Sequence, residues 1–241
     1  MARIYGEKCD LNHESLRKFF EERSKKSMES ILSLVMYQDK ENVEKRHAMD
    51  VQTLVPLLRL SGQSKIFEVG CGVGRWADAL HDKIQKYLGI DFSSGLIQIA
   101  KEHFGYDNCL FQVMSATQII ERELLLPPPY DIILFSGILM YLDDEEIIAL
   151  FKLLNSFVAE HAQIVVREPV SIIDERLTLR DFYSEGLQAE YSAIYRTEGE
   201  MIDLFKSLHG FHVTHKGFSY SRNLDSRVET QAKYYLLEKE K

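Results

Sequence analysis

The sequence is poor in residues that mark several classes of protein. Its 241 residues include only 3 cysteines and 5 prolines. Cys9, Cys71 and Cys109 are odd in number and lack CxxC spacing, so neither a disulfide framework nor a zinc site is expected. Scattered thiols of this kind are typical of a reduced, cytoplasmic protein.

Long apolar runs are missing as well. The longest one, residues 132–142, is interrupted by Ser136 and Gly137. A run of that length is typical of a buried strand rather than a membrane span, and the N-terminal residues lack the apolar core of a signal peptide. We therefore expect a cytoplasmic location and no membrane partner.

Positive charge is scarce relative to negative charge. The 29 Lys and Arg residues face 37 Asp and Glu residues, which gives a formal net charge of -8. Nucleic acids and anionic membranes are bound through surplus positive charge, so neither is an expected partner. At 45% hydrophobic residues the chain can bury a full core, and we expect one domain over residues 1–241.

Hydrophobic spacing divides the chain into a helical start and an alternating remainder. Apolar residues recur at helical spacing in residues 13–38 and 40–60, which predicts a helical cap over residues 1–64. From residue 65 onward strands are expected at 65–69, 85–90, 108–113, 130–135 and 162–168, with helices between them. The segment from residue 114 to 125 is among those expected to be helical. Such alternation predicts a parallel sheet with helices on both faces.

The end of the chain departs from this alternation. An irregular, aromatic-rich insertion is expected at residues 169–196, and Thr197 with Glu200 forms a capping box that begins a helix. Two strands, 211–220 and 230–239, follow, and the loop between them is too short for a parallel crossover. The prediction is an α/β fold: a doubly wound, seven-stranded, mostly parallel sheet with an antiparallel last strand, a helical cap and an insertion after the fifth strand.

A glycine-rich turn follows the first strand of this core, in FEVGCGVGRWADAL (residues 67–80). A dinucleotide fingerprint would need its third glycine where Arg75 stands, and a P-loop would need a Lys-Ser/Thr pair. What remains is E-x-G-x-G-x-G from Glu68 to Gly74, with Asp91 about 20 residues further on, where a ribose-binding acid is expected. A tight turn without a ligand and a helix cap at Asp91 are the structural alternatives.

Four segments, in this order and spacing, resemble the class I S-adenosylmethionine-dependent methyltransferases: FEVGCGVGRW, YLGIDFSSGLIQIAK, FQVMSATQI and YDIILFSGILMYL. The terminal antiparallel pair agrees with the seven-stranded, Rossmann-like sheet of that family. The resemblance covers residues 65–241 and implies S-adenosylmethionine as the cofactor.

The resemblance also implies which residues bind the methyl donor. Asp91 would accept both ribose hydroxyls and Phe92 would border the adenine. Ser115, which stands where many relatives carry Asp, and Ala116 would meet the adenine edge. The amino acid part of the donor would lie against a loop and a strand end formed by Glu68, Gly70, Cys71, Gly72, Phe135 and Ser136.

Three residues are candidates for the chemical step. Methyl transfer from a sulfonium mostly needs alignment and a dry site, so a general base is optional. Tyr141 is placed to orient the acceptor, Glu168 ends the fifth strand, and His47 is a candidate base in the cap. Packing in the core is the alternative for Tyr141 and His47. The acids at 143–146 have capping spacing, which favours a helix N-terminus over a metal site and predicts metal-independent transfer.

A small polar acceptor, such as a sugar or a sugar phosphate, is the preferred substrate. The cap and a lid-like insertion at 169–196 predict an enclosed pocket, and the arginines Arg176, Arg180 and Arg196 in the insertion suit a phosphate or carboxylate. The pattern resembles bacterial enzymes of surface-polysaccharide or natural-product pathways. A protein or RNA methyltransferase and a non-catalytic donor-binding module remain alternatives. The acceptor atom, oxygen or nitrogen, and the oligomeric state stay open.

Overall fold

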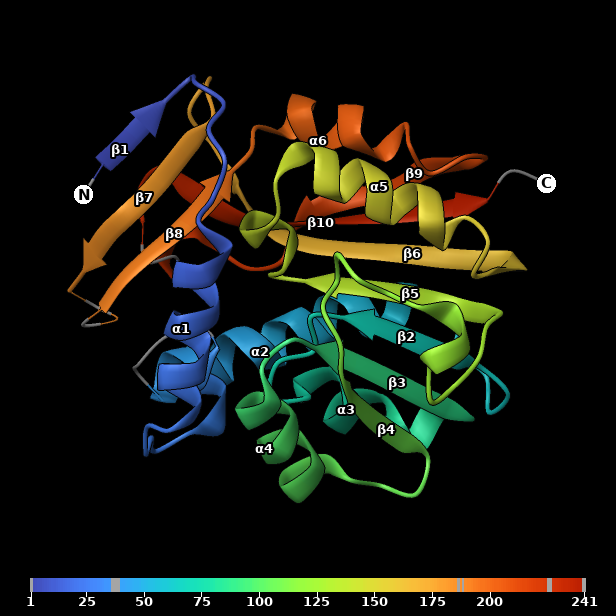
Figure 1. The fold of residues 1–241 in the computed structure, drawn as a ribbon. Coiled ribbons are helices and arrows are strands. Elements are labelled where there is room, and N and C mark those ends of the chain that lie inside the picture. The colour runs from blue at the N-terminus through green and yellow to red at the C-terminus, as the bar shows by residue number, and fades with distance from the viewer. Residues whose placement is uncertain (1, 36–39, 186, 188, 225–226, 240–241) are drawn as a thin grey trace.

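The strands form one sheet of seven and a small sheet of three (Figure 1). The computed structural model describes residues 2–35, 40–185, 187, 189–224 and 227–239. The large sheet contains, in spatial order, β4 (Cys109–Val113), β3 (Lys86–Asp91), β2 (Lys65–Val69), β5 (Tyr130–Ser136), β6 (Val158–Ser171), β10 (Thr230–Lys239) and β9 (Phe211–Phe218). Strands β2 to β6 pair in parallel, whereas β10 is antiparallel to both of its neighbours. The predicted fold class is confirmed.

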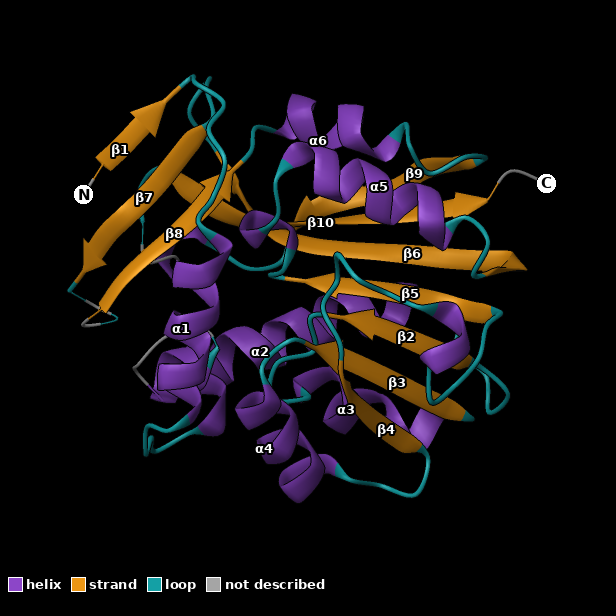
Figure 2. Cartoon of the chain, viewed as in Figure 1, coloured by secondary structure: helices purple, strands orange, loops and turns teal. Residues whose placement is uncertain are grey.

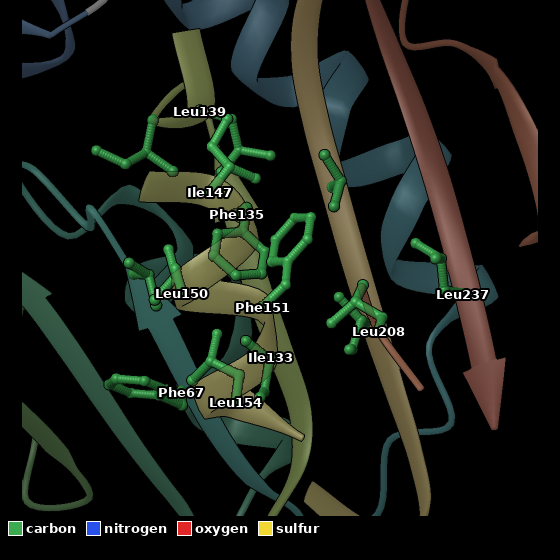
Figure 3. Packing of buried hydrophobic residues seen from close by; sticks show 14 of the residues in the cluster. Phe67, Ile133, Phe135, Leu139, Ile147, Leu150, Phe151, Leu154, Leu208 and Leu237 are labelled. Atoms are coloured by element: carbon green, nitrogen blue, oxygen red, sulfur yellow. The ribbon is translucent and has the colours of Figure 1, made fainter. Parts of the chain in front are cut away.

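Helices cover both faces of the large sheet because its central strands are apolar on both sides. Ile133 and Phe135 of β5 pack under α5 (Asp144–Leu154) and α6 (Glu198–Phe205), as Figure 3 shows for Phe135 and Phe151. The alternate residues Ile132 and Leu134 pack against α2 (Lys40–Leu54), α3 (Arg75–Leu80) and α4 (Ser94–Phe104). Figure 2 shows α5 and α6 together on the near face. None of the helices in the described part of the chain has the length and hydrophobicity needed to cross a membrane.

The N-terminal region is mostly helical, but it also contains a strand that the spacing did not predict. Helix α1 (His13–Ser24) is followed by a short 3-10 helix, Ile31–Leu34, and then by α2. Residues 36–38 of the predicted helical run lie outside the described residues. Strand β1 (Ala2–Tyr5) pairs antiparallel with β7 (Leu177–Ser184). The spacing did not predict β1, because its partner lies far away in the sequence.

The insertion at 169–196 is a β-hairpin rather than an irregular segment. Strand β6 continues to Ser171, and β7 pairs antiparallel with β8 (Ala189–Tyr195). Leu177 and Leu179 are buried in a cluster with α1, so alternate residues of β7 face the body of the protein. In Figure 1 the small sheet stands at the upper left, above α1 and beside the end of the large sheet.

The segment after β4 is not helical as predicted. Only the short 3-10 turn Glu121–Glu123 interrupts a loop. Gln112 donates from Nε2 to the carbonyl oxygen of Glu123 and accepts from the amide of Leu125, at 2.8 and 3.0 Å. These contacts satisfy main-chain groups that a helix would otherwise pair.

Candidate active site

The glycine loop connects β2 to α3 and is held by β3. The amides of Gly70 and Cys71 both donate to the carbonyl oxygen of Ile90, at 2.8 and 2.9 Å. Gly70 has φ of +74°, and a Cβ there would lie 2.7 Å from Ile138. A side chain at this position would therefore meet both backbone strain and a steric clash. The loop keeps its main chain bare toward the neighbouring cavity.

Asp91 ends β3 and fixes the loop from the other side. Its Oδ2 accepts from the amide of Gly72 at 3.0 Å and its Oδ1 accepts from the amide of Ser93 at 2.9 Å. Burial raises the pKa of Asp91 to about 6, against the lowering effect of these two amides. Each carboxylate oxygen keeps a further acceptor position, so the group can receive hydrogen bonds from a vicinal diol.

Two cavities meet at Asp91. The larger, of about 450 Å³, we call the main cavity, and the smaller, of about 240 Å³, the side cavity. Both are lined by Gly70, Asp91, Phe92, Ile138 and Tyr141. An elongated ligand can therefore pass from one cavity into the other while its middle lies on the Asp91 carboxylate.

Most of the predicted donor residues line these cavities. Glu68, Gly70, Cys71, Gly72 and Ser136 line the main cavity. Asp91 and Phe92 line both cavities, and Ser115 and Ala116 line the side cavity. Phe135 lines neither, because its ring is fully buried in the core, 5.4 Å from that of Phe151.

Glu68 is buried beneath the loop and is paired with a tyrosine. Tyr87 donates from its hydroxyl to Glu68 Oε2. Burial raises the pKa of Glu68 to about 8, although Tyr87 and Arg75 lower it. The side chain is therefore largely a neutral acid at pH 7, which suits a role in holding β2 to β3.

The three candidates for chemistry are placed very differently. Tyr141 lines both cavities. Glu168 lies outside the linings: it is 2% exposed, and its Oε1 accepts from the amides of Ile138 and Leu139 at 2.8 and 2.9 Å. It thus holds the turn that carries Tyr141. Strand β6 continues to Ser171, so Glu168 does not end the strand as predicted but lies where β6 passes the end of β5. The sequence could not distinguish the contact with the turn from a contact with an acceptor, because both need an acid at this place.

His47 also lies outside the cavity linings. Its Nδ1 is 2.8 Å from Nη1 of Arg75, and its ring meets Trp76 edge-on at 5.8 Å between centroids. Burial and the charge of Arg75 lower the pKa of His47 to about 3. A histidine with this pKa is neutral at pH 7 and is a weak base.

A buried network of charges at the main cavity is the feature that sequence reasoning missed. Asp50 is fully buried and accepts from Arg75 Nη1 at 3.1 Å and from Arg167 Nε at 2.9 Å. Arg167 also donates from Nη2 to the hydroxyl of Tyr220 at 3.0 Å, and Arg75 donates to Ser136. Arg167 is 7% exposed and lines the main cavity.

One signal for this network was present in the sequence. Asp50 lies between Val43 and Leu54 on the buried stripe of α2, at spacings of seven and four residues. An acid inside an apolar stripe needs a buried cationic partner. Spacing alone could not say which arginine supplies it.

The hairpin forms one wall of the main cavity. Phe182, Tyr183, Tyr191 and Tyr195 line it, together with Leu187. The arginines predicted to bind an acceptor from this insertion have other partners. Arg176 and Arg196 bind Asp144 of α5, and Arg180 donates to the carbonyl oxygen of Asp10.

The acids at the start of α5 cap the helix as expected. Glu146 accepts from the amide of Asp143, and the carboxylate of Asp143 completes the capping box. His13 lies 3.3 Å from Asp143 and 3.2 Å from Glu146. In the described part of the chain, this trio of an exposed histidine and two half-buried acids is the one group of His, Cys, Asp and Glu close enough to hold a metal ion. Its carboxylates already serve as caps.

The large sheet is doubly wound with one antiparallel strand, a bare glycine loop follows its first core strand, and an acid ends the next strand. Residues 66–161 match the family model of a methyltransferase domain. This part of the chain is therefore similar to methyltransferase domains, and the fold of the chain is one that solved S-adenosylmethionine-dependent methyltransferases share.

Solved structures share this fold at low sequence identity. A SAM-dependent methyltransferase from Leishmania major has a TM-score of 0.67 at 18% identity, over 91% of this chain and 81% of that one. Magnesium protoporphyrin IX methyltransferase from Synechocystis PCC 6803, with bound SAM, has a TM-score of 0.62 at 16% identity, over 97% of this chain and 100% of that one.

A third structure is longer than this chain. Phosphoethanolamine N-methyltransferase 1 from Haemonchus contortus, in complex with phosphoethanolamine and S-adenosylhomocysteine, has a TM-score of 0.71 at 19% identity. The alignment covers 94% of this chain but 48% of that one. No curated protein sequence matches the chain.

Proposed function

We propose that this enzyme transfers a methyl group from S-adenosylmethionine to an oxygen or nitrogen atom of a small polar acceptor. The observation that carries the proposal is the main cavity of about 450 Å³, which extends from the glycine loop and Asp91 to Arg167 and the hairpin wall. That volume suits a metabolite beside the methionine part of the donor.

The proposed donor site uses the residues around the junction of the two cavities. The bare main chain from Gly70 to Gly72 would lie against the amino acid part, and Asp91 would accept from the ribose hydroxyls. Phe92, with Ser115 and Ala116 in the side cavity, would border the adenine. The fit rests on the Asp91 carboxylate, whose oxygens each retain an acceptor position beyond the loop amides.

The proposed role of the protein in the chemical step is alignment. When bound, S-adenosylmethionine supplies a methyl carbon on a sulfonium: the acceptor lone pair bonds to that carbon, the C–S electron pair stays on sulfur, and the acceptor loses a proton. Tyr141, which faces both cavities, would orient the acceptor. His47 is disfavoured as a base by its pKa of about 3, and Glu168 is disfavoured by its main-chain contacts. We propose that no metal takes part.

The preferred acceptor is a sugar, a sugar phosphate or a related metabolite of bacterial surface-polysaccharide or natural-product pathways. Aromatic side chains such as Tyr191 and Tyr195 in the cavity wall suit the face of a sugar ring. We further propose that the whole chain works as one domain in the cytoplasm, with residues 1–64 and the hairpin covering the core. Nucleic acid and membrane are not proposed as partners, in keeping with the net charge of -8.

The test is a transfer assay with S-adenosylmethionine labelled on its methyl group. The enzyme is incubated with candidate sugars, sugar phosphates and amines, and with a cell extract separated into small molecules and macromolecules. We expect label in the small-molecule fraction, lost with Asp91→Ala and retained with Asp107→Ala, which changes an exposed acid.

Two outcomes would overturn the proposal. Label confined to protein or RNA would indicate a macromolecular acceptor, and binding of the donor without transfer to any fraction would indicate a non-catalytic binding module. Both alternatives share the donor site, so the distribution of label distinguishes them.

A further inference from the structure

The main cavity has a far end that the donor site does not use. Arg167 and Pro169 of β6, Tyr220 after β9, and Thr230 and Ala232 of β10 line this end. These strands lie beyond β5 in the sheet, whereas the glycine loop and Asp91 follow β2 and β3. We use the name far end for the part of the main cavity that these residues and Arg227 line.

The far end borders a buried surplus of positive charge. Arg75 and Arg167 share the single carboxylate of Asp50, and their side chains are 6% and 8% exposed. His47 adds no charge at neutral pH, because burial and Arg75 lower its pKa to about 3. Two guanidinium groups therefore face one buried carboxylate.

Arg167 keeps one nitrogen for a ligand. Its Nε donates to Asp50 and its Nη2 donates to Tyr220. Among the described residues Nη1 has no hydrogen-bond partner, and the side chain lines the cavity. Asp50 and Tyr220 hold the guanidinium from two sides, so its orientation is fixed before any ligand binds.

A second arginine lines the same cavity. Arg227, from the segment between β9 and β10, donates from Nη2 to the hydroxyl of Tyr191. Its guanidinium lies 5.5 Å from the ring centroids of both Phe182 and Tyr191. The exposed Glu185 is the acid that this wall contributes to the cavity. This carboxylate is open to solvent screening, so it opposes the guanidinium group of Arg227 only weakly.

We propose that the acceptor carries an oxyanion, a carboxylate or a phosphate, which binds at the far end through Arg167 and Arg227. The inference rests on the proposed function, since it assumes that the main cavity holds the acceptor. Guanidinium groups bind such oxyanions with paired, charge-assisted hydrogen bonds. The rings of Phe182, Tyr191 and Tyr195 pack the apolar part of the molecule. An anion bound there leaves the rest of the acceptor toward Tyr141 and the donor.

The test compares an anion with a neutral molecule of the same shape. The wild-type enzyme is saturated with S-adenosylhomocysteine, and benzoate, phenyl phosphate and benzamide are titrated by calorimetry. We expect at least one of the two anions to bind about tenfold or more tightly than benzamide, because a hydrogen bond to a charged group contributes about that factor. The difference between phenyl phosphate and benzoate then identifies the preferred oxyanion.

Two variants connect the preference to the far end. Arg227→Gln and Tyr220→Phe are expected to weaken anion binding about tenfold, with S-adenosylhomocysteine affinity unchanged. Neither variant removes a partner of Asp50, so the buried network stays paired. Arg122→Gln, at an exposed arginine of the 3-10 turn after β4, removes the same charge elsewhere and should have no effect.

The outcomes separate this inference from the proposed function. Equal affinity for benzamide and the anions, no binding of any probe to the loaded enzyme, or unchanged anion affinity in Arg227→Gln would overturn the oxyanion site while donor binding stands. If the wild-type enzyme fails to bind S-adenosylhomocysteine, the proposed function itself is overturned.

Discussion

Asp91 joins the glycine loop to both cavities through a single carboxylate. Asp91→Ala removes the acceptor proposed for the ribose hydroxyls and the contact to the Gly72 amide. We expect the affinity for S-adenosylmethionine to fall by about 1.5 to 3 kcal/mol, which is about tenfold to a hundredfold. Calorimetry measures the change, and Asp107→Ala is the matched control. Unchanged affinity in Asp91→Ala would contradict the ribose assignment.

The titration of Asp91 predicts how donor binding depends on pH. Burial raises the pKa of this carboxyl to about 6. The ionised form is the stronger acceptor, so donor affinity should be constant above about pH 7 and fall as the pH drops through 6. Titrations from pH 5 to 8 check this, with Asp91→Asn expected to lack the decline. A flat wild-type profile would show that the charge of Asp91 does not contribute to binding.

Glu68 predicts a dependence of stability on pH. Its pKa is about 8 in the folded protein, against an ordinary value of 4.5. Between these values the unfolded chain is ionised while the folded protein keeps its proton, so the free energy of unfolding falls as the pH rises from about 4.5 to 8. Glu68→Gln lacks this proton and can still accept from Tyr87. Its melting temperature relative to wild type should therefore increase from pH 5 to pH 8.

A constant difference in melting temperature across that range would contradict the raised pKa. The comparison needs no ligand, so it tests the packing of β2 against β3 independently of function. Glu145→Gln, at an exposed position of α5, is a control for the removal of one carboxylate.

At the scale of elements, Glu168 connects β6 to the turn after β5. Glu168→Ala leaves the amides of Ile138 and Leu139 without their acceptor, and we expect a loss of about 1 to 3 kcal/mol in the free energy of unfolding. Glu168→Gln keeps an acceptor oxygen and should retain most of the stability and the transfer activity. Thermal unfolding and the labelled-methyl assay measure the two quantities. A stable but inactive Glu168→Gln would restore the role of a base.

Elements could be predicted where local sequence determines them. Strand β2 and the capping boxes of α5 and α6 depend on residues close together in the chain, and they were predicted correctly. Strand β1 and the hairpin were not, because β1 pairs with β7 more than 170 residues away and the buried leucines of β7 pack against α1, which is also distant in the sequence.

At the scale of the whole molecule, Asp144 connects the two sheets. Its carboxylate accepts from Arg176 before β7 and from Arg196 after β8, at 2.7 Å each. Arg196 also donates to the carbonyl oxygens of Leu139 and Leu142. Burial opposes ionisation, but Arg196 and the hydrogen bonds from its partners hold the pKa of Asp144 well below its usual range.

Asp144→Asn should therefore destabilise the protein by about 3 kcal/mol at pH 7, because it leaves the buried guanidinium of Arg196 without a counter-charge, whereas Arg176 keeps Glu200. The stabilisation is present above the unfolded pKa of 3.8 and is lost as the pH falls through the folded value. The difference from wild type should shrink below pH 4. Chemical denaturation at pH 7 and pH 3.5 measures it, and equal differences at both values would contradict the ion pairs.

The sequence by itself determined where the proposed donor site lies. Strand and helix alternate in the chain, and the glycine loop and Asp91 lie at the ends of adjacent strands, so the positions of these residues are set by local pattern and strand order. Parallel strands bring their carboxyl ends to one edge of the sheet, and this rule needs no knowledge of packing.

Only the tertiary structure decided the proposed acceptor side of the main cavity. Asp50 of α2 and Arg167 of β6 meet in the buried network, and Arg227, from the segment before β10, lines the same cavity. Packing also decided the roles of two candidate catalytic residues. Burial makes His47 a weak base, and the fold places Glu168 under a turn instead of in the cavity. Contacts between distant segments and the desolvation of charged groups arise from packing, so they have no counterpart in local spacing.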